Sequence, residues 1–371
     1  MTEEKKKVLE KAYENLMQAV CPEDVFGEII ETSVDKAKDK LKKIYHELSR
    51  TVHPDCYDND HNLKEMAKEA FQILGDLYQQ AQKRIEDKSY GLRLENQEVA
   101  SDFLIKTLKR EYVIQANLAE GDLAVLYRGS VCGVTGLEGQ VVIKITISSD
   151  DNDLAFNEIK VLKIFQSQPS QQSKHLPVLL DNFKTTEGQH ALIIRYFDGY
   201  DLYSVREKYP SGLIPEHVAW ILARALSALG YVHSQGIIHG NIEPAHIMIR
   251  PRDHNVMIVG WSAACVNPQL TGDGFKINNE TYSPLEVAEK KSPLPSSDIY
   301  SLGKTMIYLL GGNPETKYIP LQVPLLFRQF LQAMVLDSAL QRPRDAWDLY
   351  CYLNEIRTKI WGPTRFLELK M

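Results

Sequence analysis

The chain has 371 residues, which is enough for two or three domains of ordinary size. Its hydrophobic content of 44% and charged content of 25% are typical of a folded globular protein, and the net charge of −6 argues against nucleic acid as a partner. No apolar run approaches the ~20 residues that span a bilayer, and the first residues show no secretory signal. Five scattered cysteines favour reduced thiols, so the composition predicts a cytoplasmic protein without a membrane span.

The first part of the chain, up to about residue 88, is rich in Lys, Glu, Ala and Leu. Its apolar residues recur every three or four positions, which predicts amphipathic helices around 8–20, 37–52 and 63–78. The second and third helices should pair antiparallel and bury their apolar stripes against each other. The first is an extra leading helix within residues 1–21.

His53-Pro54-Asp55 ends the second of these helices. Pro54 cannot continue a helix and forces His53 into an extended backbone, so an imidazole and a carboxylate stand side by side at a rigid turn. Basic residues recur along one face of the preceding helix, namely Lys36, Lys40, Lys43 and Arg50. The pattern predicts a docking surface for an acidic partner. The simpler interpretation is a helix-ending turn beside a solvated lysine face.

Residues 22–88 resemble a J domain, the co-chaperone module that stimulates ATP hydrolysis by DnaK-type chaperones. Pro22–Gly27 is similar to the short first helix of that family, and the basic helix, the His-Pro-Asp loop and the third helix follow in order. The resemblance implies that the loop and the basic face bind a DnaK-type chaperone. The loop residues Cys56–Asp60 are less basic than is common in the family.

After a predicted linker at 89–110, the pattern changes to β-branched runs. Strands are expected near 112–117, 124–129, 141–147, 177–183 and 191–196, and a helix at 154–165. Helical patterns dominate from residue 215 onward, interrupted by short strands at 247–249 and 256–259. A strand-rich part followed by a helix-rich part predicts an α+β arrangement of two lobes over 111–358, before a tail at 359–371.

Ordered motifs in this second part resemble those of a protein kinase. Val141-Val-Ile-Lys144 is similar to the strand that carries the phosphate-pairing lysine, and Glu158 matches the glutamate that orients it. Residues 231–249 are similar to the segment that enters the catalytic loop, while Glu286 and Arg342 match a structural pair of the C-terminal lobe. The resemblance implies a bilobal protein-kinase-like fold. It also implies a nucleotide cleft formed by Gly121, Lys144, Glu158, Arg195 and Phe197.

Four positions depart from the kinase pattern. Asn241 replaces the catalytic aspartate and has no basic site to accept a proton, and Glu243 replaces a lysine. His246 and Gly260 replace the two residues that bind magnesium, although magnesium prefers oxygen ligands. The substitutions predict a pseudokinase with no catalytic residue, no metal ligand and no required cofactor, in which ATP binding is possible without magnesium.

The sequence therefore predicts an adaptor. Its J-like domain would engage a DnaK-type chaperone, and its kinase-like domain would bind a protein client or scaffold a complex. The alternative is an atypical protein kinase, or another ATP-using transferase, that acts through the same cleft. A third possibility is a binding protein whose helices serve only as a docking or dimerisation element.

Overall fold

The computed structural model describes residues 3–19, 21–29, 33–57, 60–87, 90, 104–363 and 365–371. The chain divides into two compact units. Unit 1 comprises Met1–Ala155, Leu162–Ser173 and Val178–Tyr196, and unit 2 comprises Phe156–Val161, Lys174–Pro177 and Phe197–Met371. Most of the predicted linker, residues 89 and 91–103, lies outside the described residues, as do Asp58 and Asn59 of the predicted docking loop.

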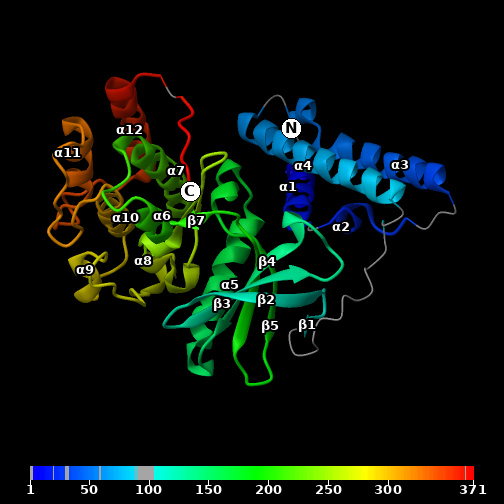
Figure 1. Ribbon diagram of the computed structural model, residues 1–371, viewed down its shortest axis with the longest axis horizontal. Coiled ribbons are helices and arrows are strands. Elements are labelled where there is room, and N and C mark those ends of the chain that lie inside the picture. The colour runs from blue at the N-terminus through cyan, green and yellow to red at the C-terminus, as the bar shows by residue number, and fades with distance from the viewer. Residues whose placement is uncertain are drawn as a thin grey trace. The chain divides into compact units, whose positions relative to one another are not determined.

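Unit 1 begins with a helical region in which α1, α3 and α4 lie side by side (Figure 1). The elements are α1 (Glu3–Gln18), α2 (Glu23–Phe26), α3 (Val34–Val52), a 3₁₀ turn (Pro54–Tyr57) and α4 (His61–Glu86). The side chain of Ser33 caps α3 by accepting a hydrogen bond from the Lys36 N–H. The helix ends at His53, whose extended backbone precedes Pro54, as the sequence predicts. The three predicted helices are confirmed: α1 begins earlier than predicted and ends two residues earlier, α3 begins three residues earlier, and α4 is longer at both ends.

The core of the helical region explains why these sequences fold as helices. The apolar stripes that recur every three or four residues are buried together, with Leu9, Leu41 and Leu74 fully enclosed. Tyr13 is also buried, and its hydroxyl donates a hydrogen bond of 3.0 Å to Glu69. The leading helix α1 is therefore an integral part of the helical core.

The remainder of unit 1 is an antiparallel sheet in the order β1-β2-β3-β4-β6-β5 (Figure 1). Its strands are β1 (Leu104–Lys106), β2 (Glu111–Glu120), β3 (Ala124–Val131), β4 (Gln140–Thr146), β5 (Leu179–Lys184) and β6 (His190–Arg195). Helix α5 (Asn152–Ser167) follows β4. The predicted strands and helix are present. The stretch predicted as a linker contains one described strand, β1, which pairs with β2.

Polar contacts and packing join the helical region to this sheet within unit 1. The Arg195 guanidinium, at the end of β6, donates a 2.8 Å hydrogen bond through Nη2 to the carbonyl oxygen of Ala19. Arg110 and Asp24 form an ion pair of 2.9 Å. Met17 packs against the apolar cluster of the sheet. The helices and the sheet therefore share an interface.

Unit 2 is mainly helical. Its helices are α6 (Leu202–Lys208), α7 (Pro215–Ser234), α8 (Pro268–Thr271), α9 (Leu285–Ala288), α10 (Pro295–Leu309), α11 (Leu325–Met334) and α12 (Ala346–Trp361). Its strands are β7 (Tyr200–Asp201), β8 (Ile237–Ile238), β9 (Ile247–Arg250), β10 (Asn255–Ile258) and β11 (Cys265–Val266). They form a sheet β10-β9-β7 and a pair β11-β8. Helix α7 is buried along most of its length, and α12 continues three residues into the predicted tail.

Candidate functional site

Asp298 of α10 anchors the loop at 239–246 in unit 2, which connects β8 to β9. This buried carboxylate accepts hydrogen bonds from the backbone N–H of His239 at 2.8 Å and of Gly240 at 2.9 Å. It also lies 2.9 Å from Nε2 of His233. Burial opposes the charge, but these donors outweigh it and keep the pKa of Asp298 below its ordinary value. Asp298 is therefore a structural charge that fixes the loop.

Two histidines of this loop, His239 and His246, form hydrogen bonds with the backbone of Asn241. His239 Nδ1 accepts from the Asn241 N–H at 3.2 Å, so its Nε2–H must donate to the Val259 carbonyl oxygen at 2.9 Å. Complete burial lowers the pKa of His239 to about 4, which agrees with this neutral form. His246 Nδ1 lies 2.8 Å from the Asn241 carbonyl oxygen and donates to it. The predicted site residues Asn241 and His246 thus lie together.

Gly260 stands where its neighbour leaves no room for a side chain. Its φ of +79° is in the left-handed region. A Cβ atom placed on Gly260 would lie 2.4 Å from Cδ2 of His246. The imidazole of His246 therefore occupies the space into which any side chain at position 260 would extend.

Trp261 is part of the core of unit 2. Its side chain is fully buried and meets the His239 ring edge-on at a centroid distance of 4.4 Å. Its indole N–H donates to the Ile258 carbonyl oxygen at 2.8 Å, and its backbone N–H donates to Glu158 Oε1 at 3.2 Å. Within unit 2, the predicted site residue Glu158 therefore supports the segment after β10. The predicted ion pair of Glu158 with Lys144 stays a prediction.

Asn157 and Asn279 are positioning residues that the sequence did not reveal. The Asn157 side-chain amide donates to the carbonyl oxygens of Ser262 and Ala264, both at 2.8 Å. The Asn279 amide donates to Glu243 Oε2 at 2.9 Å. Neither asparagine belongs to a motif, so the sequence carries no signal that could have found them.

Two residues of this loop, Asn241 and Glu243, have side-chain oxygen atoms that can act as metal ligands. Asn241 Oδ1 is buried and has no hydrogen-bond partner among the described residues. The Glu243 carboxylate, besides its contact with Asn279, lies 3.5 Å from His246 Nδ1. Magnesium takes oxygen ligands, so these residues fit it in donor type, although Gly260 and His246 do not. In the described part of the chain, no three His, Cys, Asp or Glu side chains cluster as a metal site.

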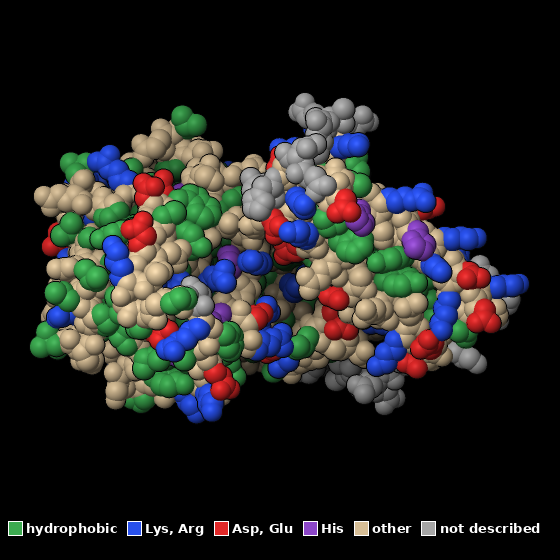
Figure 2. All heavy atoms as spheres, turned by 90° about the horizontal axis from the view of Figure 1, so that it is seen from above, with side chains coloured by type: hydrophobic (Ala, Val, Ile, Leu, Met, Phe, Trp, Pro, Cys, Tyr) green, Lys and Arg blue, Asp and Glu red, His purple; other side chains and the backbone are tan. Residues whose placement is uncertain are grey.

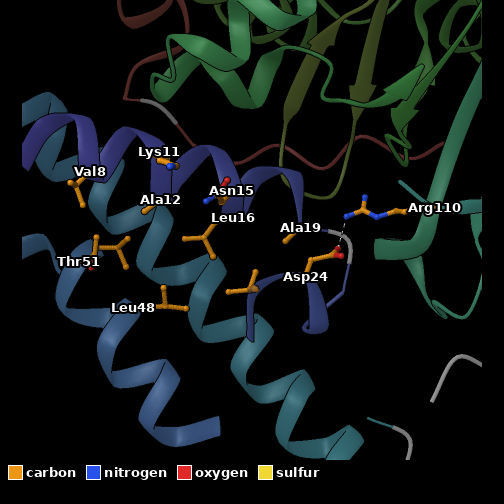
Figure 3. Close-up of a pocket in the computed structure, with 12 residues that line it drawn as sticks. Val8, Lys11, Ala12, Asn15, Leu16, Ala19, Asp24, Leu48, Thr51 and Arg110 are labelled. Atoms are coloured by element: carbon orange, nitrogen blue, oxygen red, sulfur yellow. Dashed lines mark ion pairs between the residues drawn. The ribbon is translucent and has the colours of Figure 1, made fainter. Parts of the chain in front are cut away.

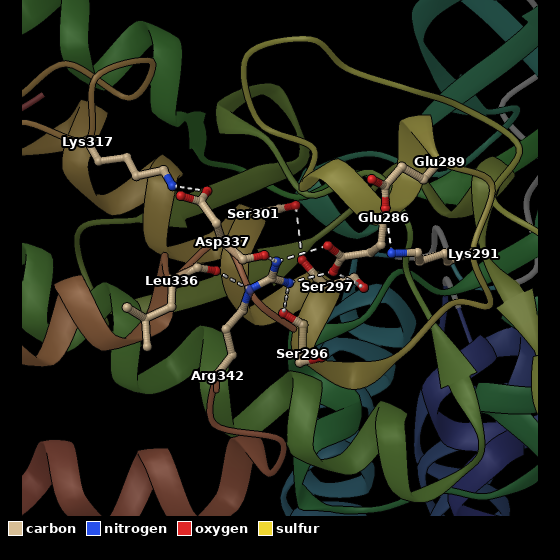
Figure 4. Close-up of polar contacts among 10 residues, drawn as sticks. All are labelled: Glu286, Glu289, Lys291, Ser296, Ser297, Ser301, Lys317, Leu336, Asp337 and Arg342. Carbon is tan, nitrogen blue, oxygen red and sulfur yellow. Dashed lines mark hydrogen bonds and ion pairs between the residues drawn. The ribbon is translucent and has the colours of Figure 1, made fainter. Parts of the chain in front are cut away.

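A second buried charge pair holds the C-terminal part of unit 2 (Figure 4). Arg342 forms a bidentate contact with Glu286, in which Nη2 lies 2.9 Å from Oε2 and Nη1 contacts Oε1. The Ser297 hydroxyl also donates to Glu286 at 2.9 Å. These donors outweigh the desolvation of the carboxylate and lower the pKa of Glu286. The predicted pairing of Arg342 with Glu286 is confirmed.

The predicted nucleotide-binding residues fall in both units. In unit 1, Lys144 lies on β4, between Leu126 of β3 and Leu192 of β6. Gly121 lies in the turn between β2 and β3, where a Cβ atom would meet only an ordinary 3.7 Å contact. The Arg195 side chain is directed to Ala19. In unit 2, Phe197 is buried, with the Arg250 guanidinium 4.9 Å from its ring centroid.

The predicted docking surface lies on the helical region of unit 1. The Asp55 N–H donates to His53 Nδ1 at 3.3 Å, and the His53 ring meets Phe71 edge-on at 5.2 Å. Lys36, Lys43 and Arg50 are exposed and Lys40 is partly exposed. Figure 2 shows Lys and Arg side chains gathered over the helical region, with acidic side chains between them.

Comparison with known proteins identifies the family. A protein kinase domain model matches residues 117–329, more than half of the chain, so this chain belongs to the protein kinase domain family. No helix in the described residues has the length and apolar character needed to cross a membrane.

The curated relatives include bacterial serine/threonine-protein kinases. The chain is 25% identical over 222 residues to serine/threonine-protein kinase pkn3 of Myxococcus xanthus, a match that covers 57% of this chain and 39% of the relative. It is 30% identical over 149 residues to serine/threonine-protein kinase B of Synechocystis, covering 37% and 25%. It is 28% identical over 196 residues to serine/threonine-protein kinase PknA of Nostoc, covering 45% and 35%. The chain thus spans well under half of each of these relatives.

Family membership corrects the prediction about cofactors. The sequence analysis expected no required cofactor and ATP binding without magnesium. That expectation is wrong, because the chain matches the protein kinase domain and its relatives are named kinases, and kinases normally use ATP together with magnesium ions.

Proposed function

We propose that this chain is an atypical ATP-using transferase of the protein kinase family. The match over 117–329 supports the proposal, as do the lysine and glutamate at positions 144 and 158. The observation that carries it is Asn241 Oδ1, a buried acceptor without a partner among the described residues, in a loop that Asp298 holds rigid. An unsatisfied buried oxygen costs roughly 1–3 kcal/mol, and a bound hydroxyl group or cation would remove that cost.

Each retained residue has a defined task in this proposal. Asn241 Oδ1 would accept a hydrogen bond from the acceptor hydroxyl and orient it, and the hydroxyl proton would pass to an oxygen of the transferred phosphoryl group. Lys144 would pair with the nucleotide phosphates. Asn241 and Glu243 would hold magnesium, which when bound neutralises the charge that develops on the transferring phosphoryl group.

Transfer of label from γ-labelled ATP to generic protein acceptors, with magnesium or manganese, tests the proposal in the full chain. We expect metal-dependent transfer that disappears in Lys144→Met. Lys208→Met removes an exposed lysine from α6 and should leave the rate unchanged. The proposal is wrong if wild type transfers no more label than Lys144→Met with either metal.

We propose a second function for the helical region, the docking of a DnaK-type chaperone, with the kinase-like domain binding a protein client. The supporting observation is local. His53-Pro54-Asp55 follows a helix whose basic face is exposed, and the Asp55 N–H donates a hydrogen bond to His53 Nδ1. Exposed lysines of this kind steer an acidic partner.

Stimulation of a DnaK-type chaperone's ATPase rate tests this second function. We expect wild type to stimulate the rate and His53→Gln to have lost the effect. His46→Gln changes another exposed histidine of α3 and serves as the control. Equal stimulation by wild type and His53→Gln would rule out the docking role.

A further inference from the structure

A cavity of about 510 Å³ lies in unit 1 where α1, α2 and α3 approach Arg110 (Figure 3). Its lining residues are Val8, Lys11, Ala12, Asn15, Leu16, Ala19, Asp24, Val25, Leu48, Thr51, Val52 and Arg110. This volume is within the range of roughly 300–1,000 Å³ that is typical of small-molecule sites. All of its lining residues belong to unit 1, whereas the loop at 239–246 belongs to unit 2.

Two large side chains of α1, Leu9 and Tyr13, do not line the cavity. Leu9 and Tyr13 are buried in the helical core, and the Tyr13 hydroxyl contacts Glu69 of α4. From α1, the cavity is lined by Val8, Lys11, Ala12, Asn15 and Leu16, and Ala19 follows the helix. The small Ala12 side chain leaves space that a larger one would fill.

The lining combines an apolar floor with a basic rim. Leu16, Leu48 and Val52 supply apolar surface, as the floor of a ligand site requires. Arg110 is neutralised by its 2.9 Å ion pair with Asp24. The Lys11 ammonium forms no hydrogen bond or ion pair with any residue in the described part of the chain. The lining therefore carries one uncompensated positive charge beside an apolar surface.

The cavity also borders the interface between the helices and the sheet. Ala19 lines it, and the Ala19 carbonyl oxygen accepts the hydrogen bond from Arg195 of β6. Arg110, another lining residue, lies between β1 and β2. A bound molecule would thus touch residues from both parts of unit 1.

We propose that this cavity binds a small amphipathic monoanion, with an apolar chain or ring on the floor and a carboxylate or similar group at Lys11. The charge balance selects an anion over a cation. The apolar floor selects an amphipathic molecule over a fully polar one such as free phosphate. The proposal rests neither on the proposed transferase activity nor on chaperone docking.

Calorimetric titration of the full chain with decanoate, decanol and decylamine tests the proposal. We expect one saturable site for decanoate, with weaker binding of decanol and weakest binding of decylamine. Lys11→Met should weaken decanoate about fivefold, the loss expected for one exposed charge contact of about 1 kcal/mol, and should leave decanol unchanged. Lys42→Met, an exposed lysine of α3 outside the cavity, should change neither.

A cavity-filling variant locates the binding. Ala12→Phe should abolish decanoate binding, provided that its far-ultraviolet circular dichroism matches wild type. Lys11→Met, a surface change, keeps the test decisive if Ala12→Phe fails to fold. No saturable decanoate binding, equal affinities in Lys11→Met and Lys42→Met, or decanol binding as tightly as decanoate would each overturn the proposal.

Discussion

Two arginines, Arg342 in unit 2 and Arg195 in unit 1, show how differently one side chain can serve a fold. Arg342 is buried and meets the Glu286 carboxylate through both of its terminal nitrogens. Arg195 is partly buried, and the one hydrogen-bond partner of its side chain among the described residues is the neutral carbonyl of Ala19. Burial, together with nearby Arg110, lowers the pKa of Arg195 to about 10, and Asp24 only partly opposes this.

The contrast separates contacts whose loss destabilises the fold strongly from contacts whose loss destabilises it little. A buried ion pair with a complete set of partners leaves a full unpaired charge when one member is removed. A charged donor on a carbonyl leaves only a neutral acceptor. The loss of Arg342 should therefore be severe for unit 2, and the loss of Arg195 mild for the interface between the helices and the sheet of unit 1.

Arg342→Ala should have the largest effect. It leaves Glu286 buried without its partner, which should lower the free energy of unfolding of unit 2 by roughly 3–5 kcal/mol. All four tryptophans lie in unit 2, so tryptophan fluorescence in a urea titration reports this unit. Arg365→Ala removes an exposed ion pair with Glu216 and should cost less than about 1 kcal/mol. Equal losses in the two variants would contradict the assignment of Arg342 as a structural charge.

Acid should weaken unit 2 through two buried neutral histidines. Burial lowers the pKa of His175 and of His239 to about 4 each, against an unfolded value of about 6.5. As the pH falls, these two histidines therefore take up protons in the unfolded chain before they do so in the folded protein. The contribution of the two histidines to the free energy of unfolding of unit 2 is therefore complete above pH 6.5. It falls as the pH drops toward 4, by about 3 kcal/mol for each histidine.

His175→Gln tests the acid effect. The Gln amide can still donate to the Val256 carbonyl oxygen, as His175 Nδ1 does at 2.8 Å. We expect roughly half of the stability lost by wild type between pH 7 and pH 4.5 to be absent in the variant, measured by urea unfolding at both values. A variant with the same pH dependence as wild type would show that His175 is not responsible.

Gly260→Asp should fail to restore a kinase-like carboxylate. The new side chain would overlap the His246 ring and strain a left-handed backbone, at a cost of roughly 2–3 kcal/mol in the stability of unit 2. His246→Ala in the same background should recover part of the loss. A double-mutant cycle from urea titrations measures this coupling, and strictly additive effects would refute the steric explanation.

The sequence predicts the helices and strands of both units because their apolar periodicities are clear and their ends carry strong signals, such as Pro54 after His53. It also predicts the partnership of Glu286 and Arg342, because both belong to recognisable motifs. Strand β1 was missed, since three residues carry too little pattern to distinguish a strand from a linker.

The candidate site was predictable in position but not in detail. Asn241, Glu243 and His246 were recognised by their places in a motif. The direction of the His246 ring toward Gly260, the support of Glu243 by Asn279, and the contact of Arg195 with Ala19 depend on residues far apart in the sequence. Such contacts follow from tertiary packing, and no local spacing encodes them.

Arg195→Met should have the smallest effect of the four changes. It removes the donor to the Ala19 carbonyl, a loss of about 1.5 kcal/mol, but it also relieves the desolvation of a charge that has no carboxylate in contact. The free energy of unfolding should change little, while the end of α1 loosens. Faster backbone hydrogen exchange in α1 is the expected observation.

Arg128→Met is the matched control, because Arg128 lies on the same sheet but contacts Gln140 and Tyr196. If both variants left the exchange of α1 unchanged, Arg195 would contribute nothing to holding the helices, and Met17 and the pair of Arg110 with Asp24 would hold them alone.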